Sequence, residues 1–291
     1  MNREVIDLYS YFGIAKPEGA KGILTTFIIN DYGFCKGRIR PAMLVLTGGG
    51  YRALSEREKE PVAFEFLSKG YQAFTLEYSL ITHKHPTQLI EGCMAMAYIR
   101  ENAEKFNIDP EHVGAIGFSA GGHLCGMLAT MTADKEVIDA LGEERAKLCK
   151  PNAVVLSYAV LSAYGNIHAG SFNVLAGDDD DGSIRRKVDL PTRVTRDSAP
   201  AFIWCTIGDK VVPCENSFNM AMAYRTKGVS FEFHTFERGG HGLSLATKET
   251  AAPSHPQQVN LPVQKWVKLM FTWLEEKGFV VTNANELQTN E

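Results

Sequence analysis

Residues 117–121 read GFSAG and place Ser119 at the centre of a G-x-S-x-G pattern. The pattern follows the apolar run 113–118 and opens into a helical pattern at 121–131, which predicts a sharp strand-to-helix turn at the serine. Such a turn strains its central residue, raises the side chain above the sheet edge and requires small flanking residues. The helix start also supplies free N–H groups and a positive dipole end beside the hydroxyl. We therefore expect Ser119 to act as a nucleophile rather than as a spare hydroxyl in a tight turn.

A serine hydroxyl is a poor nucleophile unless a base takes its proton, and eight histidines compete for that role. His241 is the predicted base, because it lies in the glycine-rich segment 238–242 (RGGHG), directly after an expected strand. From there an imidazole can reach over the sheet edge. His123 follows Ser119 on the first helical turn and is expected to point into the fold as a packing or supporting residue. The other histidines are assigned to surface loops (His83, His85, His255), to a strand interior (His234) or to connections (His112, His168).

The acid behind the histidine is expected at the end of an earlier strand. Asp209 stands in the segment 208–213 (GDKVVP), directly after the apolar run 201–207. A carboxylate there accepts the imidazole Nδ1–H, fixes the tautomer and stabilises the imidazolium. Asp197 precedes the same strand and falls at its wrong end, while Glu237 is too close in sequence to His241. Ser119, Asp209 and His241 thus follow the chain order serine, acid, histidine that is typical of α/β-hydrolases.

Three successive glycines follow the apolar run 42–46, in the segment 47–51 (TGGGY). Glycines let the backbone approach a substrate carbonyl closely and turn its N–H groups inward. The amides of Gly49 or Gly50, together with that of Ala120, are the predicted donors to the oxyanion of a tetrahedral intermediate. A simple glycine turn is the alternative. A phosphate-binding loop is not favoured, because the chain has no G-x-G-x-x-G in a first βαβ unit and no Walker lysine.

These segments need a fold that brings several strand ends together. Short apolar runs predict strands at 23–29, 42–46, 72–76, 113–118, 153–158, 201–207 and 230–236. Helical patterns lie between and after them, at 56–69, 87–106, 121–131, 215–227 and 262–277. Near-continuous apolar strands indicate burial on both faces, and the alternation of strand and helix indicates a parallel sheet. We therefore predict one α/β domain over residues 1–291, with a doubly wound, mostly parallel sheet flanked by helices.

Two regions depart from this alternation. Residues 162–198 have no clear period, and we interpret them as a cap-like insertion over the carboxyl edge of the sheet. Their acidic stretch, Asp178–Asp181, lacks the spaced ligands and the closing glutamate of a calcium loop, which favours an exposed turn. Residues 281–291 form a polar tail that we expect to fray.

Length and composition narrow the function classes. With 291 residues, 45% of them apolar, the chain can bury a core without disulfides or metals. Its net charge is −4 and its basic residues are scattered, which does not indicate a nucleic-acid surface. Residues 1–10 carry charges where an export signal needs an apolar core, and no stretch approaches the length of a membrane span. Six widely separated cysteines without a C-x-x-C pair favour buried thiols in a reducing compartment. We expect a cytoplasmic protein without cofactor or metal that binds neither nucleic acid nor membranes; the sequence leaves its oligomeric state open.

With these elements placed, the chain resembles the α/β-hydrolase esterases, and most of all the acetyl xylan esterases and bifunctional acetyl and feruloyl esterases. The resemblance covers nearly the whole chain from about Thr25 and is densest at 47–51, 117–123, 201–217 and 231–245. One departure is Thr47, where many relatives carry histidine or proline before the glycine run. The resemblance implies a serine esterase for short acyl esters, such as acetyl groups on plant-polysaccharide fragments.

Two other readings stay open. One is a serine peptidase similar to the catalytic domain of prolyl-oligopeptidases, although the chain lacks the second domain with which those enzymes gate peptides. The other is a non-catalytic α/β-hydrolase-fold protein that binds a small ester-like ligand, although such proteins usually lose one of the three catalytic residues. For any of these, Tyr51, Tyr78 and Trp266 are candidates to line an acyl or sugar pocket, with core packing as the alternative.

Overall fold

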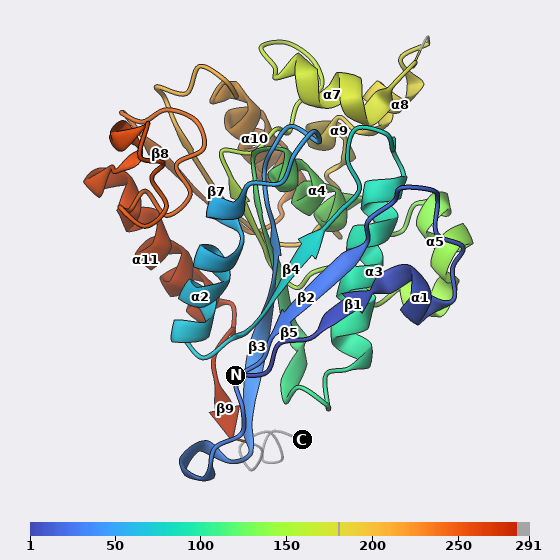
Figure 1. The fold of residues 1–291 in the computed structure, drawn as a ribbon. Coiled ribbons are helices and arrows are strands. Elements are labelled where there is room, and N and C mark those ends of the chain that lie inside the picture. The colour runs from blue at the N-terminus through green and yellow to red at the C-terminus, as the bar shows by residue number, and fades with distance from the viewer. Residues whose placement is uncertain (180, 284–291) are drawn as a thin grey trace.

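The computed structural model describes residues 1–179 and 181–283, and a nine-stranded sheet runs through its centre (Figure 1). The strand order is β1-β2-β4-β3-β5-β6-β7-β8, and β9 pairs with the start of β3. All neighbours from β4 to β8 are parallel, whereas β1, β2 and β9 pair antiparallel. The strand bounds are β1 (Val5–Asp7), β2 (Ile23–Phe27), β3 (Arg38–Leu46), β4 (Gln72–Glu77), β5 (Ile108–Phe118), β6 (Val154–Ser157), β7 (Ala201–Thr206), β8 (Phe231–Phe236) and β9 (Thr282–Asn283).

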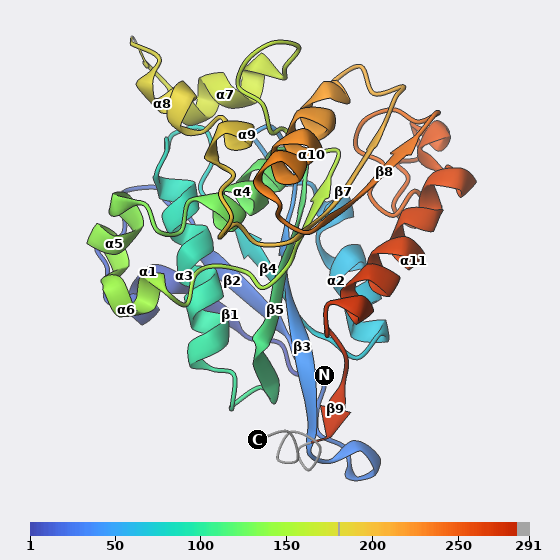
Figure 2. The ribbon, with the colours of Figure 1, turned by 180° about the vertical axis from the view of Figure 1, so that it is seen from behind.

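Helices cover both faces of the sheet (Figures 1 and 2). The α-helices are α1 (Leu8–Phe12), α2 (Glu60–Ser68), α3 (Thr87–Glu101), α4 (Ser119–Thr130), α5 (Lys135–Leu141), α6 (Glu143–Ala146), α7 (Ala169–Ala176), α8 (Ser183–Lys187), α9 (Leu190–Arg193), α10 (Glu215–Lys227) and α11 (Leu261–Glu276). Three short 3-10 helices add η1 (Gly33–Cys35), η2 (Glu56–Glu58) and η3 (Pro256–Gln258). This arrangement confirms the predicted α/β class with its mostly parallel, flanked sheet.

The side chains of β3 show why its sequence is apolar throughout. Leu44 and Leu46 belong to the core between the sheet and the layer of α3, α4 and α10. Met43 and Val45 belong to the second core, between the sheet and the layer of α2 and α11. Because successive side chains of a strand point to opposite faces, a strand covered on both sides needs apolar residues at every position.

All seven predicted strands are present, with bounds that differ by a few residues, and the structure has two further strands. The three-residue β1 and two-residue β9 were missed, because strands this short carry too few residues for a period to be visible. The helix expected at 56–69 is broken at Lys59, whose backbone is not helical, and α2 begins anew beside Pro61. Proline fits the first turn of a helix, but it clashes with the carbonyl group four residues earlier inside one. The break leaves η2 as a separate element.

Residues 162–198 contain α7, α8 and α9, which lie together beyond the carboxyl ends of the parallel strands in both ribbon views. In the acidic turn Asp178 and Asp181 are exposed and Asp179 is half-buried; the Asp178 side chain is 97% exposed. Asp179 accepts hydrogen bonds from the backbone of Ile184 and Arg185 in the first turns of α8. Asp180 and residues 284–291 lie outside the described residues. The start of the tail that was expected to fray pairs with β3 as β9.

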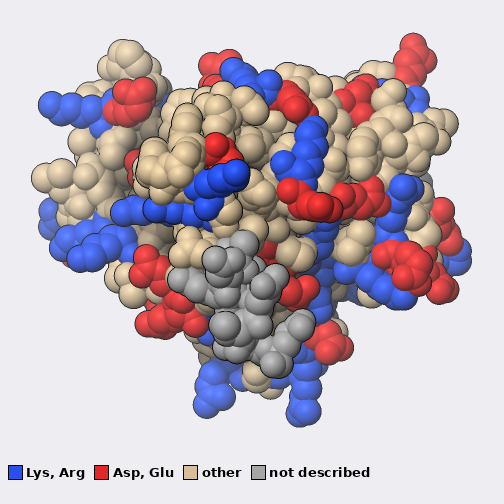
Figure 3. All heavy atoms as spheres, turned by 90° about the horizontal axis from the view of Figure 1, so that it is seen from below, with Lys and Arg blue, Asp and Glu red and all other residues tan. Residues whose placement is uncertain are grey.

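The distribution of surface charge and the burial of the cysteines are as expected from the sequence. Figure 3 shows acidic and basic side chains interspersed on the face at the β9 end of the molecule, without a field of one sign. All six cysteines are free thiols, and five of them are buried. Within residues 1–179 and 181–283, no helix combines the length and the apolar character needed to cross a bilayer.

Candidate active site

Ser119 occupies the turn between β5 and α4 in a left-handed backbone conformation, with φ of 52°. The turn is too tight for side chains at the flanking glycines. A Cβ on Gly117 would lie 2.2 Å from the carbonyl oxygen of Gly121. A Cβ on Gly121 would lie 2.3 Å from the carbonyl oxygens of Leu46 and Thr47, at the end of β3. The G-x-S-x-G pattern is thus explained by close approach of backbone to backbone, which holds the strained serine at the sheet edge.

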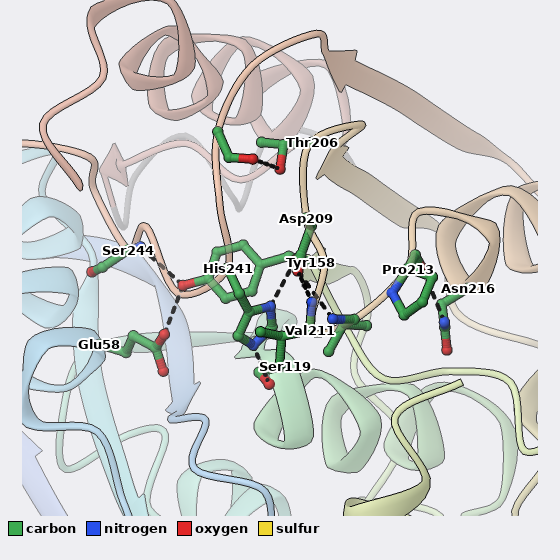
Figure 4. Close-up of polar contacts among 12 residues, drawn as sticks. Glu58, Ser119, Tyr158, Thr206, Asp209, Val211, Pro213, Asn216, His241 and Ser244 are labelled. Carbon is green, nitrogen blue, oxygen red and sulfur yellow. Dashed lines mark hydrogen bonds and ion pairs between the residues drawn. The ribbon is translucent and has the colours of Figure 1, made fainter. Parts of the chain in front are cut away.

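The structure brings the three predicted side chains into one hydrogen-bonded row (Figure 4). His241 Nε2 lies 2.8 Å from Ser119 Oγ, and His241 Nδ1 lies 2.7 Å from Asp209 Oδ2. A carboxylate only accepts, so the Nδ1 hydrogen belongs to the bond with Asp209, and Nε2 is left to accept from the serine hydroxyl. In this tautomer the imidazole can remove the proton of Ser119 during attack on a carbonyl group.

The loop after β7 fixes the carboxylate of Asp209. Its second oxygen, Oδ1, accepts the backbone N–H groups of Val211 and Val212, at 2.8 and 3.0 Å. The side chain is 1% exposed, against 17% for His241. Three hydrogen bonds to the ionised form leave this carboxylate one geometry, aimed at Nδ1.

The competing acids lie elsewhere. Asp197 is exposed, before β7, where its carbonyl group accepts a hydrogen bond from Lys150. The Glu237 side chain is 85% exposed beside Arg238. Neither side chain bonds to the row: Asp197 precedes β7 at the opposite edge of the sheet, and the Glu237 side chain is directed to solvent.

The glycine loop, residues 47–51, lies beside the serine. Gly49 and Gly50 have φ of 132° and 63°, and a Cβ on Gly49 would lie 2.1 Å from a carbonyl oxygen of the following turn. The N–H of Gly48 donates to Glu58 Oε2 at 2.7 Å. Within the described part of the chain, the N–H groups of Gly49 and Gly50 have no acceptor. Ala120 is the second residue of α4, so its N–H has no acceptor in that helix. Three unused donors thus remain around the serine, as an oxyanion hole requires.

The three aromatic residues considered for a substrate pocket do not line one. Tyr51, Tyr78 and Trp266 are each at most 1% exposed. Their polar atoms bond inside the protein: Tyr51 Oη with His123 Nδ1 at 2.9 Å, Tyr78 Oη with the Thr47 carbonyl at 2.6 Å, and Trp266 Nε1 with the Ser244 carbonyl at 3.0 Å. The core-packing alternative is therefore correct. Tyr78 bonds to the glycine loop, and Trp266 bonds to the loop that carries the histidine.

Two of the histidines that were assigned to surface loops lie inside the protein. His83 and His85 are buried, not on the surface as predicted: the backbone N–H of His85 donates to the Leu175 carbonyl of α7, and the His83 carbonyl accepts a hydrogen bond from Gln88 of α3. His123 points into the fold as predicted, and its Nε2 lies 2.9 Å from the Val188 carbonyl. Burial lowers the pKa of His123 to about 4, and burial lowers that of His85 to about 4 as well. Both imidazoles are therefore neutral at neutral pH.

We expect these buried histidines to make stability fall in mild acid. Between pH 6.5 and 4 the unfolded chain takes up a proton at His123 and the folded chain does not, so the free energy of unfolding decreases as the pH falls. The loss should be about 2 kcal/mol per buried histidine between pH 7 and 5. Urea unfolding of His123→Gln at both pH values should show a smaller pH effect than the wild type, while His255→Gln, on an exposed loop, should show the same effect. An equal pH effect in wild type and His123→Gln would contradict this.

His168 is a site residue that sequence reasoning assigned only to a connection. It caps α7, where Ser171 N–H donates to Nδ1, so the hydrogen of the neutral ring belongs on Nε2. Its Cε1 lies 3.7 Å from the place of a Cβ on Gly50, which puts the half-buried ring next to the glycine loop. Burial, followed by the charge of His241, lowers the pKa of His168. No motif marks this histidine, because only the folding of the insertion brings it to the loop.

A parallel sheet with a strained serine, a histidine and an aspartate at its carboxyl edge defines an α/β hydrolase. The family model named BD-FAE matches residues 35–224. The chain belongs to the BD-FAE family of α/β hydrolases.

Similar proteins fit this placement. The chain is 39% identical over 216 residues to endo-1,4-beta-xylanase B of Butyrivibrio fibrisolvens and 27% identical over 212 residues to an acetylxylan esterase of Xylanibacter ruminicola. These matches cover 72% and 71% of this chain but only 33% and 42% of the relatives' own length.

Solved structures match over nearly the whole chain. The acetyl ester-xyloside bifunctional hydrolase of Caldicellulosiruptor lactoaceticus is 31% identical, with a TM-score of 0.79 over 95% of this chain and 97% of that one. The carboxylesterase Cest-2923 of Lactobacillus plantarum is 26% identical, with a TM-score of 0.77 over 90% and 94% of the two chains.

Proposed function

We propose that the protein is a serine carboxylic-ester hydrolase that acts on short acyl esters, with Ser119 as nucleophile, His241 as base and Asp209 as the acid that orients it. The observation that carries the proposal is the row of hydrogen bonds from hydroxyl to imidazole to carboxylate, at 2.8 and 2.7 Å. The esterases among the similar proteins support the same chemistry.

In the proposed reaction Ser119 Oγ attacks the ester carbonyl while His241 Nε2 takes its proton. The negative charge that develops on the carbonyl oxygen is held by the N–H groups of Gly49, Gly50 and Ala120. The imidazolium, stabilised by Asp209, then gives the proton to the departing alcohol and leaves an acyl-serine. Water then attacks the acyl-serine while His241 takes a proton from it, and His241 returns this proton to Ser119 Oγ as the acid is released. Each proton is handled by a group of this chain.

The substrate class follows from the relatives. A xylanase, an acetylxylan esterase and an acetyl ester-xyloside hydrolase are among the similar proteins. We therefore propose acetyl groups on xylan-type oligosaccharides as the natural substrate.

An ester panel tests the proposal. We expect 4-nitrophenyl acetate to be hydrolysed at least about tenfold faster than the octanoate, and acetylated xylo-oligosaccharides to release acetate. Methyl ferulate tests the second activity that the sequence resemblance implies, and the Ser119→Ala protein serves as the blank. A preference for long acyl chains would instead indicate a lipase-like carboxylesterase.

Two further measurements separate the other classes. Cleavage of proline-containing peptides without ester hydrolysis would indicate a peptidase. A fluorophosphonate probe should label Ser119 covalently, whereas a protein that only binds esters should not react.

A further inference from the structure

We propose that Glu58 and Tyr158 form a buried bridge that positions the glycine loop relative to the histidine loop, residues 238–244. The carboxylate of Glu58 joins the two: Oε2 accepts the N–H of Gly48 at 2.7 Å, and Oε1 accepts the hydroxyl of Tyr158 at 2.6 Å. The Tyr158 oxygen in turn accepts the N–H of Ser244 at 2.9 Å, three residues after the catalytic histidine. A continuous chain of hydrogen bonds thus links the two loops, and Figure 4 shows its part from Glu58 through Tyr158 to Ser244.

The bridge is buried, so each of its polar groups needs a hydrogen-bond partner inside the protein. Glu58 is 3% exposed, and a carboxylate in such a place must have its hydrogen bonds satisfied. Burial, followed by the negative charge of Glu58, raises the pKa of Tyr158 well above its ordinary value, so the phenol keeps the hydrogen that it donates.

Tyr158 also contacts the base directly. Its ring packs edge-on against the imidazole of His241, with 5.1 Å between the ring centroids. Tyr158 and Ser244 have φ of 36° and 51°, in the left-handed region that such residues rarely adopt. Strained conformations persist where the surroundings fix them, and they collect at functional sites. Both strained residues belong to the bridge: Tyr158 packs against His241, and Ser244 is part of the histidine loop.

The short helix η2 holds the histidine loop at further points. Arg57 donates to the Gly242 carbonyl at 2.9 Å and also to the Thr250 carbonyl. The Ser244 hydroxyl donates to the Arg57 carbonyl at 2.7 Å. The helix η2 is therefore bonded to the histidine loop through Arg57, and its last residue, Glu58, bonds to the glycine loop.

The bridge matters because the two loops must act together. The glycine loop holds the proposed oxyanion donors, whereas the histidine loop holds the base, and no neighbouring strand joins them: β3 and β8 are far apart in the sheet order. A displacement of about 1 Å between such groups can lower the rate about 100-fold. A Cβ on Gly48 would lie 2.8 Å from Glu58 Oε2 and 2.9 Å from Ser119 Cβ, so the bridge ends beside the nucleophile.

Glu58→Gln tests the bridge with little change in shape. Both neighbours donate to the carboxylate, and glutamine keeps only one acceptor oxygen. Its NH2 group then faces either the Gly48 N–H, which is a donor, or the Tyr158 hydroxyl, whose hydrogen loses its acceptor. This inference rests on the proposed esterase function. We expect kcat for 4-nitrophenyl acetate to fall about 10- to 100-fold while KM changes less than about threefold, because oxyanion placement acts on the transition state.

Two companion variants sharpen the test. Tyr158→Phe keeps the ring against His241 but removes the hydroxyl, and it should lower kcat in the same way. Glu56→Gln changes an exposed glutamate of the same helix, and it should match the wild type. The melting temperature identifies a variant that does not fold, in which case Tyr158→Phe carries the test. Folded variants at Glu58 and Tyr158 with wild-type kcat would overturn the bridge, as would losses confined to KM.

A readout that does not use activity separates this inference from the proposed function. Hydrogen exchange of the Gly48 and Ser244 amides should be faster in Glu58→Gln than in Glu56→Gln. If the wild type neither hydrolyses esters nor reacts with a fluorophosphonate, the proposed function fails, and the exchange rates still decide whether the bridge holds the loops. Unchanged exchange at both amides would refute it.

Discussion

Replacing Ser119 by alanine should reduce hydrolysis of 4-nitrophenyl acetate by about 10⁶-fold, to the small residual rate that binding and the oxyanion donors provide. The reason is that the hydroxyl, the imidazole and the carboxylate act as one unit along the row of hydrogen bonds at 2.8 and 2.7 Å. Without the nucleophile, the base has no proton to remove. Steady-state rates at saturating ester, with protein of verified melting temperature, measure the effect.

The chain offers a matched control for this experiment. Ser254 and His255 form another serine–histidine hydrogen bond, at 2.8 Å, on an exposed loop. Ser254→Ala should leave the rate unchanged, because neither residue has a left-handed backbone and, among the described residues, no carboxylate bonds to His255. The double variant Ser119→Ala, His241→Ala should lose little more than the single one. A Ser119→Ala protein that retains wild-type turnover would end the assignment of the nucleophile.

Asp209→Asn should lower kcat by about 10⁴-fold with the fold intact. The Asp209 carboxylate accepts N–H groups from Val211, Val212 and His241. An asparagine has one acceptor oxygen, and the two backbone N–H groups retain it. Its NH2 group then faces Nδ1, which reverses the imidazole tautomer and turns a hydrogen on Nε2 toward Ser119. A base that already carries this hydrogen cannot take the serine proton.

The matched control for this variant is Asp197→Asn, an exposed change before the same strand. It should retain wild-type rates. A nearly active Asp209→Asn protein would show that the carboxylate does not select the tautomer. A loss that follows a lowered melting temperature, and that returns on cooling, would assign the residue to stability instead of catalysis.

The sequence by itself determined the sheet, the turn and the three residues of the row. Short apolar runs without polar alternation fit strands buried on both faces, and the structure has all seven predicted strands. The G-x-S-x-G pattern marked the turn because the backbones approach to distances that no Cβ allows. Asp209 and His241 could be chosen because both directly follow strands, and parallel strands end at one edge of the sheet.

Only the tertiary structure decided what surrounds these residues. Tyr51, Tyr78 and Trp266 were candidates for a pocket, and they are core residues, because burial of a side chain depends on segments far away in the chain. His168 and Glu58 carried no signal of their own: His168 lies in residues 162–198, which have no clear period, and Glu58 lies in a segment that was expected to be one continuous helix. Burial and hydrogen bonds across 100 positions, such as that between Glu58 and Tyr158, arise from packing, which local residue types and spacing do not encode.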